Sequence, residues 1–210
     1  MTNSDALLCD KSHDGVLPFN ILLFEGFETL DACGPAEIAG KVPRYRLGYY
    51  SMNGGPVTSA QQLEVNTRPL REMPPGLFLI PGGMGTRTLV DDAGFIEQIR
   101  WAALEARFVL TVCTGASLLA KTGLMDGKSA TTNKIAFDWV VSVNPKVNWI
   151  RRGRWVRDGS LFSSSGVSAG MDMTLAFIAE DLGAEEAERI ARRIEYLWNR
   201  HPDDDPFVWG

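Results

Sequence analysis

The chain has 210 residues, of which 45% are hydrophobic and 22% are charged, a balance typical of one globular domain with a sizeable core. Its formal net charge of −5 argues against the basic surface that binds nucleic acid, so no nucleic-acid partner is expected. No apolar run comes near the length of about 18 residues that a membrane-spanning helix needs, so no membrane partner is expected.

The N-terminal stretch 1–18 is mostly polar and lacks the apolar core of a signal peptide, so we expect a loose leader there. Residues 19–200 carry the apolar patterning of a folded domain. Residues 201–210 form a polar tail that we expect to be frayed. Neither an internal repeat nor an interdomain linker is visible, so the sequence predicts a single domain.

Short apolar runs typical of strands alternate with longer segments of helical spacing. We expect strands at residues 19–24, 45–51, 57–59, 63–65, 77–80, 108–112 and, around a hairpin turn, 155–162. We expect helices at residues 29–39, 93–106, 115–122, 133–141, 168–182 and 184–198. This alternation predicts an α/β fold in which helices cover both faces of a mostly parallel sheet.

Cys113 stands where a buried strand is predicted to turn sharply into a helix. The run Phe108–Val112 is mostly apolar, and Thr114-Gly115-Ala116-Ser117 opens the helix that follows. A residue at such a turn lies at the carboxyl edge of the sheet and faces the positive end of the helix dipole, which favours a thiolate. The pattern predicts Cys113 as a nucleophile, with simple packing of a small apolar side chain as the alternative.

Two other predicted strands are followed directly by an acidic residue or by glycines. Glu25-Gly26 follows the first strand, and Pro81-Gly82-Gly83 follows the strand at 77–80. Because parallel strands end at one edge of a sheet, we expect these segments to lie near Cys113. Backbone amides at Gly82, Gly83 and the elbow residues Thr114 and Gly115 are expected to bind substrate and developing negative charge. The glycines equally suit a tight turn, and the two roles are compatible.

The counts of cysteine and histidine limit the chemistry further. The cysteines, Cys9, Cys33 and Cys113, are far apart and odd in number, which favours a reducing cytoplasm over a disulfide framework. Two histidines in the whole chain argue against a zinc site, and we predict no metal and no cofactor. We interpret Cys33 as a packed residue near a dimer contact, with a redox partnership with Cys113 as the alternative.

Several motifs, in the same order along residues 19 to 198, resemble those of the DJ-1/PfpI superfamily. They are Phe24-Glu25-Gly26, Leu30-Asp31-Ala32-Cys33-Gly34-Pro35, Ile80-Pro81-Gly82-Gly83, Val112-Cys113-Thr114-Gly115, 123–132, Asp158-Gly159 and 166–172. The chain most resembles the isocyanide hydratase branch, whose motifs also occur in the amidotransferase-like domain of certain AraC-type regulators. The resemblance implies a flavodoxin-like three-layer sandwich with a nucleophile elbow, and a homodimer.

The resemblance also implies an acid beside the cysteine. In isocyanide hydratases this acid is an aspartate in a Leu-Asp-x-x-Gly-Pro motif, and the matching position here is Asp31. Glu25 and Glu28 are nearby but do not align with that role. From spacing alone, Asp31 is equally well explained as an acid in the first turn of a helix, where it complements the helix dipole.

An imidazole at the expected places is absent. Thr114 stands where PfpI-type peptidases carry a histidine, and Asn133 replaces a histidine that is frequent in related sequences. His13 and His201 lie in the predicted leader and tail. Peptide hydrolysis by a Cys–His pair is therefore not expected.

The resemblance leads us to expect a cysteine-dependent lyase that hydrates a small electrophile, an isocyanide, to an N-formamide. Cys113 would attack the terminal carbon, Asp31 would supply the proton, and Thr114 would position water or the substrate nitrogen. A noncatalytic sensor with an oxidisable Cys113 and a glyoxalase-like enzyme are the alternatives. Asn133 and Ser163-Ser164-Ser165, which stands where glycines are common, depart from the family pattern and bear mainly on substrate choice.

Overall fold

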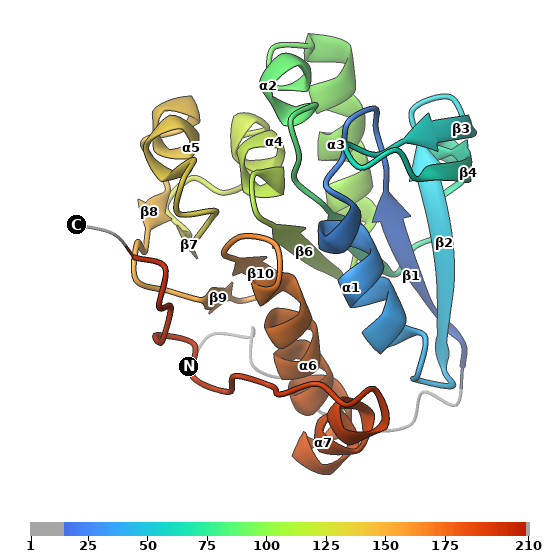
Figure 1. Cartoon of the computed structure of the whole chain (residues 1–210). Helices are drawn as coiled ribbons and strands as arrows, with labels where there is room; N and C mark the ends of the chain where they lie inside the picture. Colours follow the sequence, from blue (N-terminus) through green and yellow to red (C-terminus); the bar gives the residue numbers. More distant parts are fainter. Residues whose placement is uncertain (1–14, 209–210) are drawn as a thin grey trace, which may run out of the picture.

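An eight-stranded sheet forms the centre of the computed structural model, which describes residues 15–208 (Figure 1). The strand order is β3-β4-β2-β1-β5-β6-β10-β9. The strands are β1 (Leu17–Leu22), β2 (Tyr45–Ser51), β3 (Gly55–Thr58), β4 (Glu64–Pro69), β5 (Leu77–Ile80), β6 (Phe108–Val112), β9 (Trp155–Asp158) and β10 (Leu161–Ser164). All neighbours are parallel except the pairs β3–β4 and β9–β10. A separate parallel pair joins β7 (Ser129–Ala130) to β8 (Asn148–Trp149).

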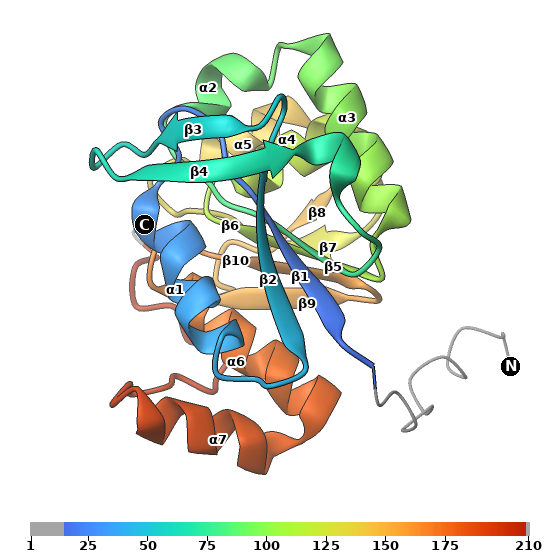
Figure 2. The ribbon, with the colours of Figure 1, turned by 90° about the vertical axis from the view of Figure 1, so that its right-hand side faces the viewer.

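Helices cover both faces of this sheet, so the fold is the predicted α/β sandwich with a mostly parallel sheet. Figure 2 shows α1, α6 and α7 on one side and α3 and α4 on the other. The helices are α1 (Thr29–Ala39), α2 (Thr86–Leu89), α3 (Ala93–Glu105), α4 (Gly115–Lys121), α5 (Phe137–Val143), α6 (Ala169–Leu182) and α7 (Ala184–Arg193), with a 3-10 turn at Leu70–Glu72. Across residues 15–208, no helix combines the length and the apolar character that crossing a membrane requires.

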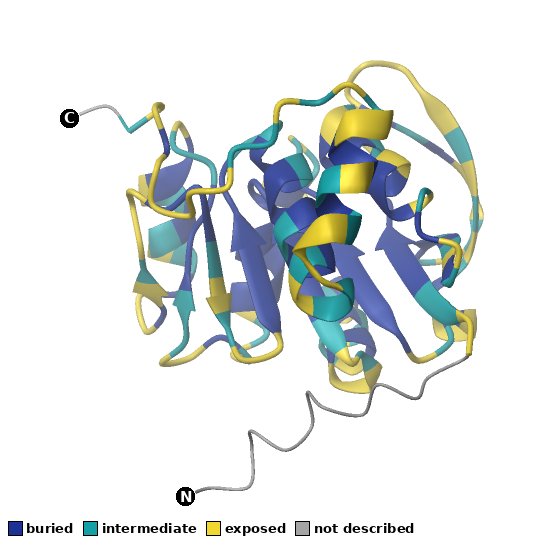
Figure 3. Cartoon of the chain, turned by 90° about the horizontal axis from the view of Figure 1, so that it is seen from below, coloured by how far each residue is buried: buried dark blue, intermediate teal, exposed yellow. Residues whose placement is uncertain are grey.

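The buried core lies where the central strands meet the helices. In Figure 3 the strands are mostly dark blue and the outward faces of the helices yellow. The ring of Phe177, on α6, packs edge-on against Phe108 and Phe162, with both ring centroids 5.3 Å away. These contacts hold α6 against strands β6 and β10, because aromatic side chains bury the largest apolar area per residue.

Most predicted elements appear close to their predicted bounds, and the exceptions have local causes. The first strand begins at Leu17, where it pairs with Tyr45, and so includes two residues assigned to the leader. Residues 1–14 of the leader, with Cys9 and His13, lie outside the described residues. The last helix ends at Arg193, because the chain soon adopts a positive φ of 53° at Glu195.

The expectation of a frayed tail does not hold for residues 201–208. The Arg154 N–H donates to Pro202 O at 2.6 Å, and the buried Asp205 carboxylate lies 3.5 Å from Lys134 Nζ. Upstream, Asp172 on α6 accepts hydrogen bonds from Tyr196 Oη and the Asn199 N–H. The final segment therefore runs along the domain, held by backbone and side-chain contacts.

We expect Phe177→Ala to lower the free energy of unfolding by about 3–5 kcal/mol, because it removes a buried ring and leaves a cavity between α6 and the sheet. Chemical denaturation monitored by circular dichroism measures this change. Phe207→Ala, which truncates a half-exposed phenylalanine in the final segment, is the matched control, with an expected change within about 0.5 kcal/mol. Equal losses in both variants would contradict the assigned core.

Candidate active site

Cys113 lies on a strained turn between β6 and α4. Its φ of 58° is in the left-handed region that non-glycine residues rarely adopt, and such strain costs on the order of 1–3 kcal/mol. The turn is possible because Gly115 follows: a Cβ there would lie 2.3 Å from Ile80 O and 2.6 Å from Pro81 O. Only glycine lets the start of α4 approach the end of β5 this closely, and the Cys113 side chain is left 6% exposed.

Asp31 enters the same site from α1. Its carboxyl group is fully buried, and Oδ2 accepts a hydrogen bond from the Gly82 N–H at 2.9 Å. A Cβ on Gly82 would lie 2.9 Å from Asp31 Oδ2 and 2.6 Å from Thr114 N. Gly82 is therefore the place where the end of β5, helix α1 and the elbow touch.

Thr114 is held by a small network on the other side of this contact. The Gly83 N–H donates to Thr114 Oγ1 at 3.0 Å, and Thr86 Oγ1 lies 3.1 Å from Thr114 Oγ1 and donates to Gly83 O at 2.7 Å. Thr86 belongs to the four-residue helix α2, which is too short to give a periodic signal, and sequence analysis missed it. The network fixes the Thr114 side chain beside the elbow.

The glycine amides differ in role from the sequence-based expectation. The Gly82 N–H is bonded to Asp31 and the Gly83 N–H to Thr114, so both donors already have protein acceptors. These two N–H groups position Asp31 and Thr114 and are not free to bind a substrate. The backbone N–H groups that face the Cys113 sulfur are those of Thr114 and Val167.

Burial is the main reason that the pKa of Asp31 rises from 3.8 to about 8. The nearby Glu28 charge raises the pKa of Asp31 further, whereas the hydrogen bonds with the Gly82 N–H and the Cys113 side chain lower it. The other oxygen, Oδ1, is buried and has no hydrogen-bond partner among the described residues. Asp31 is therefore a neutral acid at pH 7. Glu28, set aside on sequence grounds, acts on it through charge.

Burial also raises the pKa of the Cys113 thiol, and a negative charge on Asp31 raises it further. The Thr114 and Val167 N–H groups and the Thr114 hydroxyl act in the opposite direction, because they hydrogen-bond the sulfur. Two negative charges side by side are unfavourable in this buried site. Both groups are therefore protonated in the resting site, which differs from the expectation that the helix dipole alone favours a thiolate; the thiolate is the form that attacks, and the Thr114 N–H and hydroxyl stabilise it when it forms.

Other residues singled out from the sequence occupy peripheral places. Glu25 is exposed and accepts from the Thr58 N–H, and Cys33 is half-buried on α1 beside Tyr49. His201 is exposed in the final segment. None of these side chains has a hydrogen bond with Cys113, and within residues 15–208 no three His, Cys, Asp or Glu side chains are grouped as a metal site needs.

Asn133 and the serine run lie close to the elbow. Asn133 Oδ1 accepts from the Ala136 N–H at 2.9 Å, and its amide lies against Gly166. Ser165 O and Ser164 O both accept from the Cys113 N–H at 3.2 Å. The serines thus fit where the related sequences carry glycines, since their backbone supports the turn directly.

A cavity of about 230 Å³ lies in this region, lined by Asn133, Lys134, Ile135, Ser165, Gly166, Val167, Ser168 and Phe207. Ser165, one of these lining residues, accepts the Cys113 N–H, so the cavity adjoins the elbow. A larger cavity of about 900 Å³ borders Phe24, Gly85 and Phe95. Cys113 and Asp31 line neither cavity, but only the smaller one includes Ser165, whose carbonyl accepts the Cys113 N–H, so the smaller cavity is the one next to the elbow.

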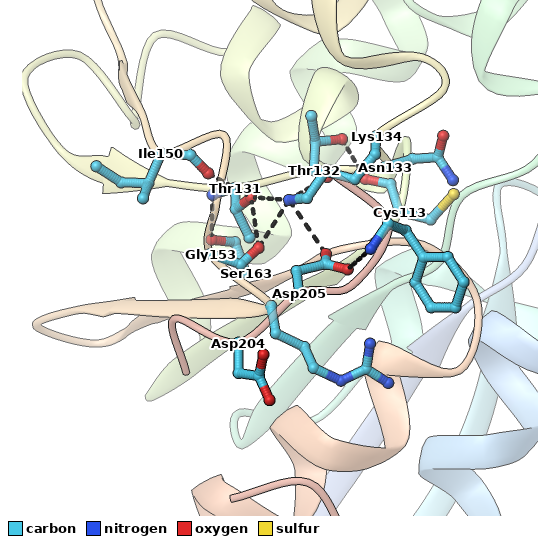
Figure 4. Close-up of polar contacts among 12 residues, drawn as sticks. Cys113, Thr131, Thr132, Asn133, Lys134, Ile150, Gly153, Ser163, Asp204 and Asp205 are labelled. Carbon is cyan, nitrogen blue, oxygen red and sulfur yellow. Dashed lines mark hydrogen bonds and ion pairs between the residues drawn. The ribbon is translucent and has the colours of Figure 1, made fainter. Parts of the chain in front are cut away.

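A buried lysine next to the elbow was not predicted from the sequence. Figure 4 shows Lys134 Nζ directed at Thr131, Gly153 and Asp205. It donates to Thr131 Oγ1 at 2.8 Å and Gly153 O at 2.7 Å, and its side chain is 4% exposed. Burial lowers the pKa of Lys134 to about 8, opposed by the Asp205 carboxylate. The preceding Thr132 donates its hydroxyl to Cys113 O at 2.7 Å, which links this cluster to the elbow.

The chain was compared with known protein families and structures. The sequence model of the DJ-1/PfpI family matches residues 19–180. The isonitrile hydratase of Pseudomonas putida is 34% identical over 183 residues, which cover 86% of this chain and 78% of that protein. The HTH-type transcriptional regulator CdhR of Pseudomonas aeruginosa is 26% identical over 84% of this chain, which spans 54% of the regulator.

The solved structures agree with the sequence matches. A ThiJ/PfpI family protein from Pseudomonas syringae aligns with a TM-score of 0.79 and 25% identity, over 99% of this chain and 84% of that one. DJ-1beta of Drosophila melanogaster aligns with a TM-score of 0.76 and 18% identity, over 87% of this chain and all of that one. At such identity the second match shows the fold alone.

The raised pKa of Asp31 makes stability depend on pH in a specific direction. An acid whose pKa rises from 3.8 to about 8 on folding stabilises the fold fully below 3.8, and this contribution is lost as the pH rises towards about 8. We expect the free energy of unfolding of the unchanged protein, minus that of Asp31→Asn, to fall steadily across this range. Denaturant titrations at a series of pH values measure it.

Glu37→Gln on the same helix removes an exposed carboxylate and is the control for loss of a charge. It is expected to change little over the same range, because surface ion pairs contribute at most about 1 kcal/mol. A pH-independent difference for Asp31→Asn would show that Asp31 titrates alike in the folded and unfolded chain, against the protonated acid described above.

Proposed function

The chain belongs to the DJ-1/PfpI family, and from that premise we propose that it is a cysteine-dependent lyase that hydrates small isocyanides to N-formamides. The observation that carries the proposal is the pairing of Cys113, on its strained elbow, with Asp31, whose pKa is raised to about 8 by burial. The 34% identity to the Pseudomonas putida isonitrile hydratase supports the same reaction.

The first step forms a carbon–sulfur bond. The Cys113 thiolate adds to the terminal carbon of the isocyanide, and the electron pair that develops on that carbon takes the proton from Asp31. The product is a thioimidate on Cys113, with Asp31 now a carboxylate. The negative charge passes from sulfur to Asp31, where the Gly82 N–H already donates a hydrogen bond.

The second step consumes water. The Asp31 carboxylate takes a proton from a water molecule as the oxygen adds to the thioimidate carbon. The carbon–sulfur bond then breaks, the hydroxyl proton moves to nitrogen, and the N-formamide leaves. Cys113 returns as a thiolate and Asp31 as an acid, so isocyanide and water give formamide with no external oxidant or reductant.

Thr114 has a supporting role in this scheme. Its backbone N–H and its hydroxyl face the sulfur, so it favours the thiolate before addition and after its release. Gly82, Gly83 and Gly115 act through position: they bring Asp31, Thr114 and the elbow together. A peptidase mechanism has less support, because His201, the histidine in the described part of the chain, is exposed in the final segment.

The setting of the enzyme is also a proposal. Three cysteines that are far apart in the sequence support a reducing cytoplasm. The family resemblance supports a homodimer.

We expect the purified protein to convert an alkyl or aryl isocyanide to the formamide over many turnovers. Chromatography measures the formamide that forms. Cys113→Ala should abolish turnover while the circular dichroism spectrum is kept, because the nucleophile is lost. Asp31→Asn should lower kcat by a factor of about 10²–10⁴, the range for loss of a general acid. Cys33→Ala, which removes the half-buried cysteine of α1, should retain activity and serves as the control.

Turnover that survives Cys113→Ala would refute the mechanism. No turnover by the unchanged protein, with Cys113 still alkylated or oxidised, would instead favour the sensor or a different electrophile.

A further inference from the structure

The cavity of about 230 Å³ beside Cys113 determines where the rest of a bound substrate must go. Ser165, which lines it, accepts the Cys113 N–H at 3.2 Å, and Thr132, next to the lining residue Asn133, donates its hydroxyl to Cys113 O at 2.7 Å. In the proposed reaction the sulfur holds the terminal carbon, and the substituent on nitrogen extends away from it. This cavity is the adjoining space that can receive that substituent.

Two exposed apolar side chains stand at this cavity. Ile135 is 93% exposed and Phe207 is 51% exposed, and both belong to its lining. Large apolar side chains gathered at a concave site are typical of ligand binding, because ligand pockets are lined mostly by apolar groups. Phe207 comes from the last residues of the chain, far in sequence from the other lining residues.

The position of Phe207 depends on a buried ion pair. Asp205 Oδ1 accepts a hydrogen bond from the Phe207 N–H at 3.0 Å, and Asp205 Oδ2 lies 3.5 Å from Lys134 Nζ. The Asp205 side chain is fully buried (Figure 4). Lys134 itself is held by Thr131 and Gly153, so the anchor of the segment is part of the domain.

A buried ion pair is weak evidence for stability, because desolvation of both charges offsets most of their attraction. Here the pair has a clear geometric effect, since it brings a chain end to the rim of the cavity. The Arg154 N–H, which donates to Pro202 O, provides a second attachment of the same segment.

We propose that Phe207 is a specificity-determining residue, and that the segment 201–208, anchored by Asp205 on Lys134, forms a wall that limits the size of the substituent able to reach Cys113. The identity of the substrate as an isocyanide rests on the proposed function. The restriction of access to Cys113 by this wall does not depend on that reaction. The wall restricts any reagent that approaches the sulfur through this cavity.

Alkylation of Cys113 by reagents of different size tests the wall without any catalysis. In a background with Cys9 and Cys33 replaced by serine, the rates with iodoacetamide and with the bulkier N-phenylmaleimide are measured by mass spectrometry. Phe207→Ala should raise the N-phenylmaleimide rate relative to the iodoacetamide rate about tenfold, and Phe207→Trp should lower it, by the usual effect of pocket size on selectivity. An unchanged ratio in both variants would overturn the proposal.

The anchor has its own matched pair of variants. Asp205→Asn keeps an acceptor for the Phe207 N–H but removes the charge that faces Lys134, and should shift the ratio in the same direction as Phe207→Ala. Asp203→Asn removes an exposed charge from the same segment and should leave the ratio as it was. A thermal melt of each variant reports whether it is folded. A folded Asp205→Asn with the original ratio would refute the anchor.

Measuring turnover of two isocyanides of different size tests this proposal separately from the proposed function. With tert-butyl and 2-naphthyl isocyanide as substrates, Phe207→Ala should raise kcat/KM for the larger relative to the smaller one. If the unchanged protein hydrates neither, the hydratase proposal fails, while the alkylation ratios still decide whether Phe207 controls access. If it hydrates both and Phe207→Ala leaves their kcat/KM ratio and the alkylation ratio unchanged, the wall fails alone.

Discussion

The hydrogen bond from the Gly82 N–H to Asp31 is the contact on which the site depends, because three elements meet there. It joins helix α1 to the end of β5, and the missing side chain of Gly82 admits the elbow on the other side. Burial at this junction raises the pKa of Asp31 and of the Cys113 thiol, and a neutral Asp31 spares the sulfur the additional rise that an Asp31 charge causes. The arrangement of the site and the raised pKa of Asp31 thus have one origin, the close packing that Gly82 allows because it has no side chain.

Local signals were enough to predict most of the fold and the position of Cys113 at the elbow, whereas the role of Asp31 beside it was predicted from the family resemblance. The bounds of α1, β2, β5 and β6 agree with their apolar runs, and parallel strand ends bring Cys113 to the edge where Gly82 lies. What sequence analysis missed depends on contacts between distant residues. The Lys134–Asp205 pair joins a loop to the last residues and has no local pattern. The glycine amides found protein acceptors that only the folded chain brings within reach.

Relatives of this domain include an enzyme and a transcriptional regulator, although they share one fold. The fold therefore supplies a place for chemistry at the elbow and leaves its use to the surrounding residues. In this chain those residues include Asn133 beside Gly166 and the segment that carries Phe207. Under the proposal above, the segment that carries Phe207 controls which molecules reach the sulfur.

The partnership of Lys134 with Asp205 has a consequence for the order of events during synthesis. A ribosome adds roughly 5–20 residues per second, so Lys134 emerges several seconds before Asp205 exists. In that interval the nascent chain holds a lysine whose native burial requires a counter-charge not yet made. The residues that complete the surroundings of Lys134 are thus made seconds after the elbow itself, so the elbow can form before its neighbour Lys134 has its counter-charge.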